Sequence, residues 1–230
     1  MNKYEITKRI EEFAPLETQE DWDCSGWAVN VEVHNEINKL MLCLTVTNDV
    51  VRQAKEQNCD MIVSHHPCFS VPLEWSEINI YCTHTNMDKA RNGTTDNIIE
   101  KLRLSKYKIN IEHEFLRIID YNTTIQDFSR LLKQISPNTR IINNNHTTEL
   151  KKIAFCAGSG SEFIKNAKEL GADCLVTGDL KFHTALESPI VIYDIGHFES
   201  EILILPVFEK IIGNDVKIVY ADEHSPFELI

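Results

Sequence analysis

The chain has 230 residues, of which 43% are hydrophobic and 25% are charged, the balance of a globular protein with a buried core. The formal net charge is −12 without a lysine or arginine cluster, which argues against binding of nucleic acid through its phosphates. The polar N-terminus and the lack of an apolar stretch of about 20 residues argue against a signal peptide or membrane span, so a cytoplasmic protein is expected.

Short apolar runs alternate with amphipathic stretches, which predicts an α/β fold with parallel strand pairing. The first half is predicted to contain a helix over 4–13, a strand over 40–46, a helix capped by Asn48, strands over 60–64 and 78–83, a helix over 96–104 and a strand over 115–121. The second half is predicted to contain a helix from Thr124, strands over 153–157, 174–177 and 190–193, a long helix over 197–212 that ends at Gly213, and a strand over 216–220. We treat residues 1–230 as one unit of two similar lobes, with approximate ranges 1–120 and 121–230.

An internal similarity supports two related halves. A shift of 113 positions matches Cys43 with Cys156, Ala54-Lys55-Glu56 with Ala167-Lys168-Glu169, Asp60 with Asp173, and Val63 with Val176. The same shift places Ser64-His65-His66 on Thr177-Gly178-Asp179. Ligands of open α/β sheets bind beyond the carboxyl ends of strands, so His66 and Asp179 mark equivalent candidate positions.

The seven cysteines include no C-x-x-C pair, and several lie in apolar runs. They are expected to be small buried thiols of a reducing compartment, rather than a thiolate nucleophile or a zinc–cysteine site.

Two adjacent histidines, His65 and His66, directly follow a predicted strand. Neighbouring side chains within a strand point to opposite faces, so two such rings would not serve one site. Here the strand ends and Pro67 restricts His66 to an extended or turning backbone, so the rings can diverge and reach two nearby metal ions. Taken alone, the dipeptide favours a pair of surface histidines.

A second group runs from His84 to Asp88 and also follows a predicted strand. Asp88 offers a hard anionic oxygen of the kind that Mg, Mn, Fe or Zn accepts. His84 is either a ligand or a group that orients another ligand. Taken alone, the segment favours a turn, because Asn and Asp are turn residues.

A third group contains His197 and Glu201, four residues apart at the start of a predicted helix. They share one helical face, a spacing that metal ligands use. A helix N-terminus favours glutamate by itself, which accounts for Glu201 but not for His197.

Together the three groups provide histidines and carboxylates that fit two metal ions about 3.5–4 Å apart. A carboxylate can bridge such a pair, and a bridging water would become a hydroxide nucleophile near neutral pH. The ligand types suit Zn, Fe, Mn, Ni or Co. A further segment, Gly158-Ser159-Gly160-Ser161, could hold a phosphate through its N–H groups, although a tight turn is the expected use.

These segments resemble the GTP cyclohydrolase 1 type 2 homolog family, also called the Nif-three-like family of dinuclear-metal proteins. The resemblance runs in order through Trp22-Asp23, Ile62-Val63-Ser64-His65-His66-Pro67, His84-Thr85-Asn86-Met87-Asp88, Gly158-Ser159-Gly160-Ser161, Thr177-Gly178-Asp179-Leu180-Lys181-Phe182-His183, and Gly196-His197 with Glu201.

The resemblance implies two α/β lobes with a dinuclear metal site between them and a ring-shaped homohexamer. It implies metal ligands at His65, His66, Asp88, His197 and Glu201, and a short form of the family without an inserted middle domain. Cys24 stands where the family usually has Asn, and Thr45 where it often has Asp. Neither position is a ligand in the family pattern, so these departures put only a catalytic role of the two positions in doubt.

We therefore expect a metal-dependent hydrolase that acts on a nucleotide or a small heterocycle through a metal-bridging hydroxide. His84, Asp179, Lys181 and His183 are candidates for acid–base or ligand-orienting roles. The alternative is a non-catalytic metal-binding scaffold or regulatory interaction protein. A third interpretation is an ordinary α/β domain whose histidines have no role in metal binding, and it predicts no stoichiometric metal.

Overall fold

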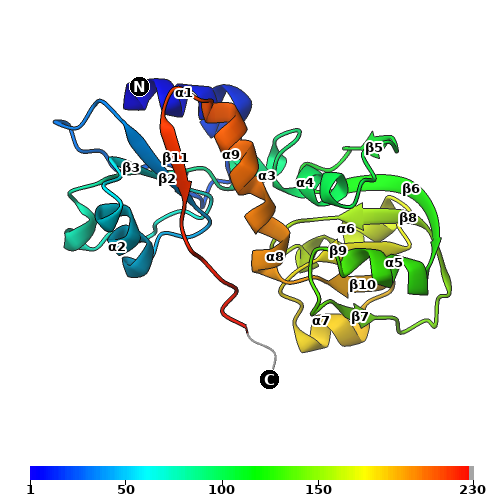
Figure 1. Ribbon diagram of the computed structural model, residues 1–230. Coiled ribbons are helices and arrows are strands. Elements are labelled where there is room, and N and C mark those ends of the chain that lie inside the picture. Colours follow the sequence, from blue (N-terminus) through cyan, green and yellow to red (C-terminus); the bar gives the residue numbers. More distant parts are fainter. Residues whose placement is uncertain (228–230) are drawn as a thin grey trace. The chain divides into compact units, whose positions relative to one another are not determined.

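The computed structural model describes residues 1–227 as two compact units (Figure 1). Unit 1 comprises Met1–Gly93 and Ile204–His224, and unit 2 comprises Thr94–Leu203 with the chain from Ser225. The expected boundary near residue 120 differs from this division, because α4 (Thr94–Lys101), β5 (Ile109–Asn110) and the start of β6 (Arg117–Thr124) belong to unit 2. No helix within residues 1–227 combines the length and apolar character that crossing a membrane requires.

Unit 1 is built on a five-stranded sheet with the order β1-β4-β3-β2-β11. Its strands are β1 (Gly26–Val29), β2 (Lys39–Cys43), β3 (Met61–Ser64), β4 (Asn79–Cys82) and β11 (Lys217–Tyr220). All pairings are parallel except β1 with β4. Its helices are α1 (Lys3–Phe13), η1 (Leu16–Thr18), α2 (Asn48–Glu56), η2 (Leu73–Trp75), α3 (Thr85–Lys89) and α9 (Leu205–Ile212).

Unit 2 is built on a six-stranded sheet with the order β5-β6-β8-β9-β10-β7. Its strands are β5 (Ile109–Asn110), β6 (Arg117–Thr124), β7 (Arg140–Ile142), β8 (Glu149–Phe155), β9 (Cys174–Thr177) and β10 (Val191–Asp194). Strands β8, β9 and β10 are parallel, and the outer pairings are antiparallel. Its helices are α4 (Thr94–Lys101), α5 (Ile125–Leu132), η3 (Ser161–Phe163), α6 (Ile164–Glu169), α7 (Phe182–Glu187) and α8 (His197–Glu201), and η4 (Ile202–Ile204) leads the chain back to unit 1.

The central strands of both sheets are covered on both faces. In unit 2, Ile153 and Phe155 of β8 pack into one apolar cluster, whereas Ala154 between them packs into the cluster on the opposite face. Strands β3, β4, β9 and β10 are buried at every residue. Parallel strands covered by helices on both sides require this continuous apolar character, which explains why they were predicted correctly from short apolar runs.

The internal similarity extends to the structure. The shift of 113 positions takes β3, residues 61–64, onto β9, residues 174–177, and takes α2, residues 48–56, onto the η3–α6 segment, residues 161–169. Asp60 Oδ2 accepts hydrogen bonds from the N–H groups of Asn38 and Lys39 at 2.7 and 3.1 Å. Asp173 Oδ2 accepts the same pair of bonds, 113 positions further on, at 2.8 and 3.0 Å. The two units are therefore similar α/β lobes, as expected.

Two helix predictions were wrong in detail. Thr47, in an extended conformation, is the N-cap of α2 and accepts a bond from the Val50 N–H at 3.2 Å. Asn48 instead accepts a hydrogen bond from the Trp75 indole at 2.8 Å, so its side chain is not available for capping. The predicted helix over 197–212 breaks at η4, because Pro206 lacks an N–H and its ring clashes with the preceding turn. Its predicted end at Gly213 is confirmed.

Candidate metal centre

His65 is held in one tautomer at the end of β3. The ring is fully buried, and its Nδ1 lies 3.0 Å from the carbonyl oxygen of Thr83. A carbonyl oxygen only accepts, so Nδ1 carries the proton and Nε2 carries the lone pair. Nε2 lies 3.5 Å from Asp88 Oδ1. This is the arrangement of a metal-ligating histidine, whose other ring nitrogen donates to a carbonyl.

The rings of His65 and His66 lie next to one another because strand β3 ends at Ser64, before both residues. The ring centroids lie 5.2 Å apart at 43° to one another, so the two rings diverge as expected from the Pro67 sequence. The Nδ1 atom of His66 lies 2.7 Å from the Thr45 hydroxyl, which orients the ring from the end of β2. Thr45, where the family often has Asp, thus contacts a predicted ligand.

His84 belongs to the same cluster. One nitrogen from each of His65, His66 and His84 lies within 4.8 Å of the others, close enough to hold one ion. Burial and the neighbouring His65 lower the pKa of His84, which favours the neutral imidazole that a metal requires. His84 Nδ1 lies 3.2 Å from Asp23 Oδ1, so Asp23 orients this ring.

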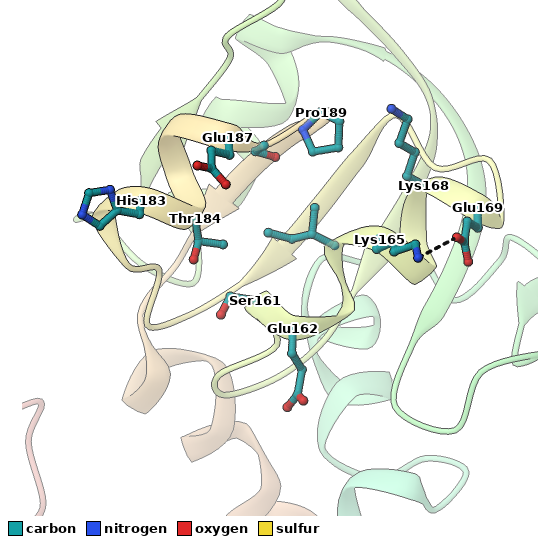
Figure 2. A pocket seen from close by; sticks show the side chains of 11 residues that line it. Ser161, Glu162, Lys165, Lys168, Glu169, His183, Thr184, Glu187 and Pro189 are labelled. Carbon is teal, nitrogen blue, oxygen red and sulfur yellow. Dashed lines mark ion pairs between the residues drawn. The ribbon is translucent and has the colours of Figure 1, made fainter.

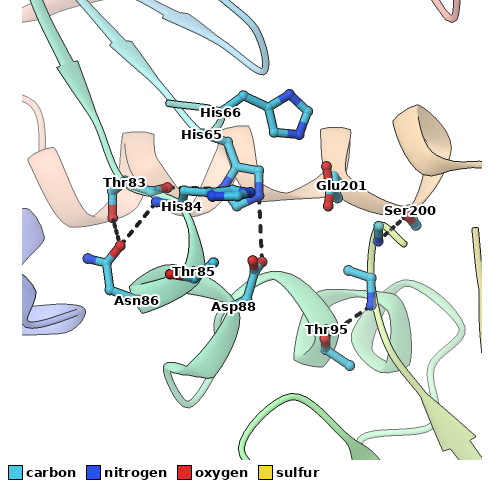
Figure 3. A network of polar contacts seen from close by, with 12 residues as sticks. His65, His66, Thr83, His84, Thr85, Asn86, Asp88, Thr95, Ser200 and Glu201 are labelled. Carbon is cyan, nitrogen blue, oxygen red and sulfur yellow. Dashed lines mark hydrogen bonds and ion pairs between the residues drawn. The ribbon is translucent and has the colours of Figure 1, made fainter. Parts of the chain in front are cut away.

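A polar network fixes the short helix α3, which carries Asp88. Figure 3 shows Asn86 accepting from both the Thr83 hydroxyl and the His84 N–H, at 3.3 and 3.0 Å. Asp23 accepts from the Thr85 N–H at 3.0 Å and so caps the helix from a distant part of the chain. Burial opposes the charge of Asp23, but the hydrogen bonds from Thr85 keep its pKa below the usual value. No local pattern in the sequence predicts these roles for Asp23 and Asn86.

In unit 2, His197 lies between two carboxylates. Its Nε2 is 2.9 Å from Glu201 Oε2, one helical turn away on α8, and its Nδ1 is 2.7 Å from Asp179 Oδ2. Burial alone would lower the pKa of His197, but the hydrogen bonds and charges of Glu201 and Asp179 raise it to about 9. Asp179 has φ = 54°, a left-handed conformation that Asp tolerates, directly after β9.

Glycines bring the backbone close to His197 and Glu201. A Cβ at Gly158 (φ = 61°) would lie 2.0 Å from Glu201 Oε1, and a Cβ at Gly178 would lie 2.7 Å from the backbone nitrogen of His197. The N–H groups of Gly158 and Gly160 donate to the hydroxyls of Ser200 and Thr177 at 2.9 and 2.8 Å. The segment is thus a tight turn whose N–H groups at Gly158 and Gly160 are already engaged.

The remaining candidates in unit 2 do not join one cluster. His183 is exposed on α7 and lines a pocket of about 740 Å³ with Ser161 and Lys165 (Figure 2). Lys181 is exposed at the N-cap of α7 and makes no side-chain capping bond. Asp179 and His197 instead line a separate cavity of about 280 Å³.

The ligand pattern itself is repeated within the chain. The shift of 113 positions that matches β3 with β9 places His84 on His197 and Asp88 on Glu201. Each pair is four residues apart and follows the third parallel strand of its βαβ unit, β4 or β10. This repeat was not predicted, although the four-residue spacing recurs in the sequence at the same shift.

Comparison with known proteins gave consistent matches. The family model described as Duf34/NIF3 (NGG1p interacting factor 3) matches residues 1–226. A Clostridium perfringens protein named GTP cyclohydrolase 1 type 2 homolog is 30% identical over 100% of both chains. The structure of reduced HcgD from Methanocaldococcus jannaschii is 26% identical, covers 97% of this chain and 98% of that chain, and has a TM-score of 0.84. Staphylococcus aureus hypothetical protein SA1388, at 20% identity, covers 100% of this chain and 99% of that chain with a TM-score of 0.85, which shows the fold.

Proposed function

The chain belongs to the Duf34/NIF3 family, and on this premise we propose that it holds two divalent metal ions in one dinuclear centre. The proposed ligands are His65, His66 and Asp88 of unit 1 with His197 and Glu201 of unit 2. Mixed imidazole and carboxylate ligands suit Zn, Fe, Mn, Ni or Co.

The observation that carries the proposal is the orientation of His65. Its Nδ1–H is committed to the Thr83 carbonyl, so a buried Nε2 lone pair is directed toward the Asp88 carboxylate at 3.5 Å. Two acceptors in this position repel one another unless a cation or a proton lies between them. A divalent ion satisfies both groups, and the Nδ1 hydrogen bond is the outer contact that such ligands normally make.

We propose further that the protein is a metal-dependent hydrolase for a nucleotide or a small heterocycle. The bound ions would supply Lewis acidity and lower the pKa of water toward about 7. Asp179 holds the His197 ring from its far side at 2.7 Å, and both line the 280 Å³ cavity together with Asn138, Arg140 and Glu199. A cavity of this size beside a proposed ligand is suited to a small polar substrate. The name of the Clostridium perfringens relative agrees with this class of reaction.

One observation favours a non-catalytic role instead. The N–H groups of Gly158 and Gly160 are engaged by hydroxyls, so this turn does not offer them to a triphosphate. A metal-binding scaffold that acts through partners is therefore the second candidate function. In either case we propose a cytoplasmic protein that assembles as a ring-shaped homohexamer, as the family resemblance implies. Native mass spectrometry would give six chains per particle.

The test is metal content by elemental mass spectrometry of the wild type and of the His65→Ala and Glu201→Ala variants. We expect about two ions per chain in the wild type and a sharp fall in both variants. His224→Ala is the matched control, because His224 is an exposed histidine whose ion pair with Asp222 lies at the surface. An absence of metal in the wild type after incubation with Zn, Mn and Fe would overturn the proposal.

A panel of hydrolase substrates then separates the two functions. Turnover that disappears in Glu201→Ala supports the hydrolase. Tight metal binding without turnover of any substrate supports the scaffold.

A further inference from the structure

Two cysteines of unit 1 lie in contact beside the proposed ligands. The Sγ atoms of Cys68 and Cys82 are 3.8 Å apart, and both residues are free thiols. Cys82 is the last residue of β4 and is completely buried. Cys68 is partly exposed and lies two residues after His66. One member of the pair is thus accessible to a small oxidant, and the other is protected in the core.

The pair can close by movement of one segment. A disulfide requires the sulfur atoms to approach from 3.8 Å to about 2.05 Å. Cys82 is fixed by the register of β4 with β3, in which it pairs with Ser64. Cys68 lies in the irregular segment between β3 and η2, so it has no strand or helix to hold it. Formation of the disulfide therefore moves the segment that contains His65, His66 and Cys68.

A shared hydroxyl connects the pair to the proposed ligands. Ser64 Oγ lies 3.2 Å from Cys82 Sγ and 3.0 Å from the carbonyl oxygen of His66, with geometry to donate to either. Movement of Cys68 toward Cys82 shifts the neighbouring backbone, including the His66 carbonyl two residues earlier, and therefore changes this arrangement. The orientation of the His66 ring, which the Thr45 hydroxyl supports, changes as a result.

We propose that Cys68 and Cys82 form a reversible disulfide on exposure to a hydroperoxide, and that this bond weakens metal binding at His65 and His66. The second part rests on the proposed dinuclear centre, whereas the first part does not.

The reaction balances in two steps. The Cys68 sulfur attacks one oxygen of hydrogen peroxide, the O–O bond breaks, and the products are a sulfenic acid and one water. The Cys82 sulfur then displaces the hydroxyl from the Cys68 sulfur, which forms the S–S bond and releases a second water with the Cys82 proton. The two sulfurs supply the two electrons that reduce the peroxide. A dithiol reductant reverses the reaction by thiol–disulfide exchange.

The experiment treats the reduced full-length protein with hydrogen peroxide, blocks the remaining thiols and maps the peptides by mass spectrometry. We expect a Cys68–Cys82 cross-linked peptide and a fall from seven free thiols to five, because one disulfide consumes two. Cys68→Ser abolishes the cross-link and is expected to fold, since Cys68 is only partly buried. Cys24→Ser is the control, because it removes an exposed thiol outside the pair and leaves the cross-link intact.

The second readout is Zn²⁺ affinity by competition with a chromophoric chelator. Oxidised wild type is expected to bind at least about 10-fold more weakly than reduced wild type, and a dithiol restores the affinity. The affinity of Cys68→Ser does not respond to peroxide. An oxidised Cys68 without the cross-link, or a cross-link to Cys24, overturns the disulfide. A mapped disulfide with unchanged Zn²⁺ affinity overturns the effect on the ligands. If the reduced protein binds no Zn²⁺, the dinuclear centre and this effect fall together, and peptide mapping alone decides the disulfide.

Discussion

His197, one of the proposed ligands, lies between two carboxylates. Its two ring nitrogens each face a carboxylate, Asp179 at 2.7 Å and Glu201 at 2.9 Å, so the protonated imidazolium satisfies all three groups. A divalent ion must displace the proton that bridges His197 and Glu201. The metal-free protein therefore contains a stabilising ion pair at the position where the metal-bound protein would contain a coordination bond.

This arrangement predicts a pH-dependent stability of the metal-free protein. The folded pKa of His197 is raised from 6.5 to about 9, so its stabilising contribution is complete below pH 6.5 and is lost as the pH rises through 9. In the presence of a metal chelator, the difference in free energy of unfolding between wild type and His197→Asn is expected to shrink as the pH rises from 6.5 to 9. Urea unfolding at several pH values measures it. Asn145→Ala, at an exposed loop position of unit 2 without a titratable side chain, should give a constant difference. A constant difference for His197→Asn as well would contradict the assignment.

Gly158 gives a second prediction at this scale. Alanine at position 158 would have to adopt a φ of 61°, which is unfavourable for a residue with a Cβ. That Cβ would lie 2.0 Å from Glu201 Oε1. We expect Gly158→Ala to cost about 1–2 kcal/mol of stability and to lower the metal content by displacing the Glu201 carboxylate. Gly171→Ala is the matched control, since φ is 83° but the nearest atom is the flexible end of Lys152 at 3.5 Å. The Gly171→Ala variant should lose stability without losing metal. Equal metal content in Gly158→Ala and Gly171→Ala would argue against the role of Gly158.

At the scale of elements, the sequence predicts the two short helices that carry proposed ligands, α3 and α8, to different extents. The start of α8 was predicted, because His197 and Glu201 occupy one face after a glycine. The segment that forms α3 favours a turn in the sequence, because it contains turn residues and its helix ends after five residues, whereas α8 continues through η4 into α9. The bonds that hold α3 come from Asp23, a residue far away in the sequence, and no local pattern encodes such a contact.

The strands follow the same rule. Strand β9 was predicted with its observed ends, because a strand buried on both faces is a continuous apolar run. Strands β1, β5 and β7 were missed, because they are short, partly exposed and at or next to sheet edges. Their pairing is decided by partners elsewhere in the chain. Local composition thus predicts the scaffold under the candidate site and fails for the elements at its margins.

The dependence of α3 on Asp23 leads to a prediction for that element. Asp23→Ala removes the acceptor of the Thr85 N–H and of the Thr85 hydroxyl, and leaves His84 without its carboxylate contact. We expect a loss of about 1–2 kcal/mol in urea unfolding, as for the loss of a helix cap. Metal affinity should also fall by about 10-fold or more, because α3 carries Asp88. Asp21→Ala, an exposed neighbour, is the control. Wild-type stability and affinity in Asp23→Ala would show that α3 holds its position without this cap.

For the whole molecule, the duplication accounts for how the proposed ligands are distributed. Each unit places a His and a carboxylate four residues apart after equivalent strands, His84 with Asp88 and His197 with Glu201. The copies have diverged at the end of the preceding strand, where one has His66 and the other has Asp179. In the proposed centre the first copy supplies an additional ligand at this position, whereas the second copy supplies a carboxylate that orients His197.

A shared centre predicts that ligand substitutions in different units are coupled. If His65 and Glu201 serve one dinuclear site, either single alanine variant weakens binding of both ions. The double variant then loses little more binding free energy than the single variant that binds more weakly. Two independent sites would instead lose one ion in each single variant, and the losses in binding free energy would add in the double variant. Isothermal titration with Zn²⁺ on the wild type, both single variants and the double variant gives the stoichiometry and the coupling energy. A coupling energy above about 0.5 kcal/mol supports one centre, because sites without shared ligands add within that margin. Additive losses with one ion retained in each single variant would show that each unit binds its own ion.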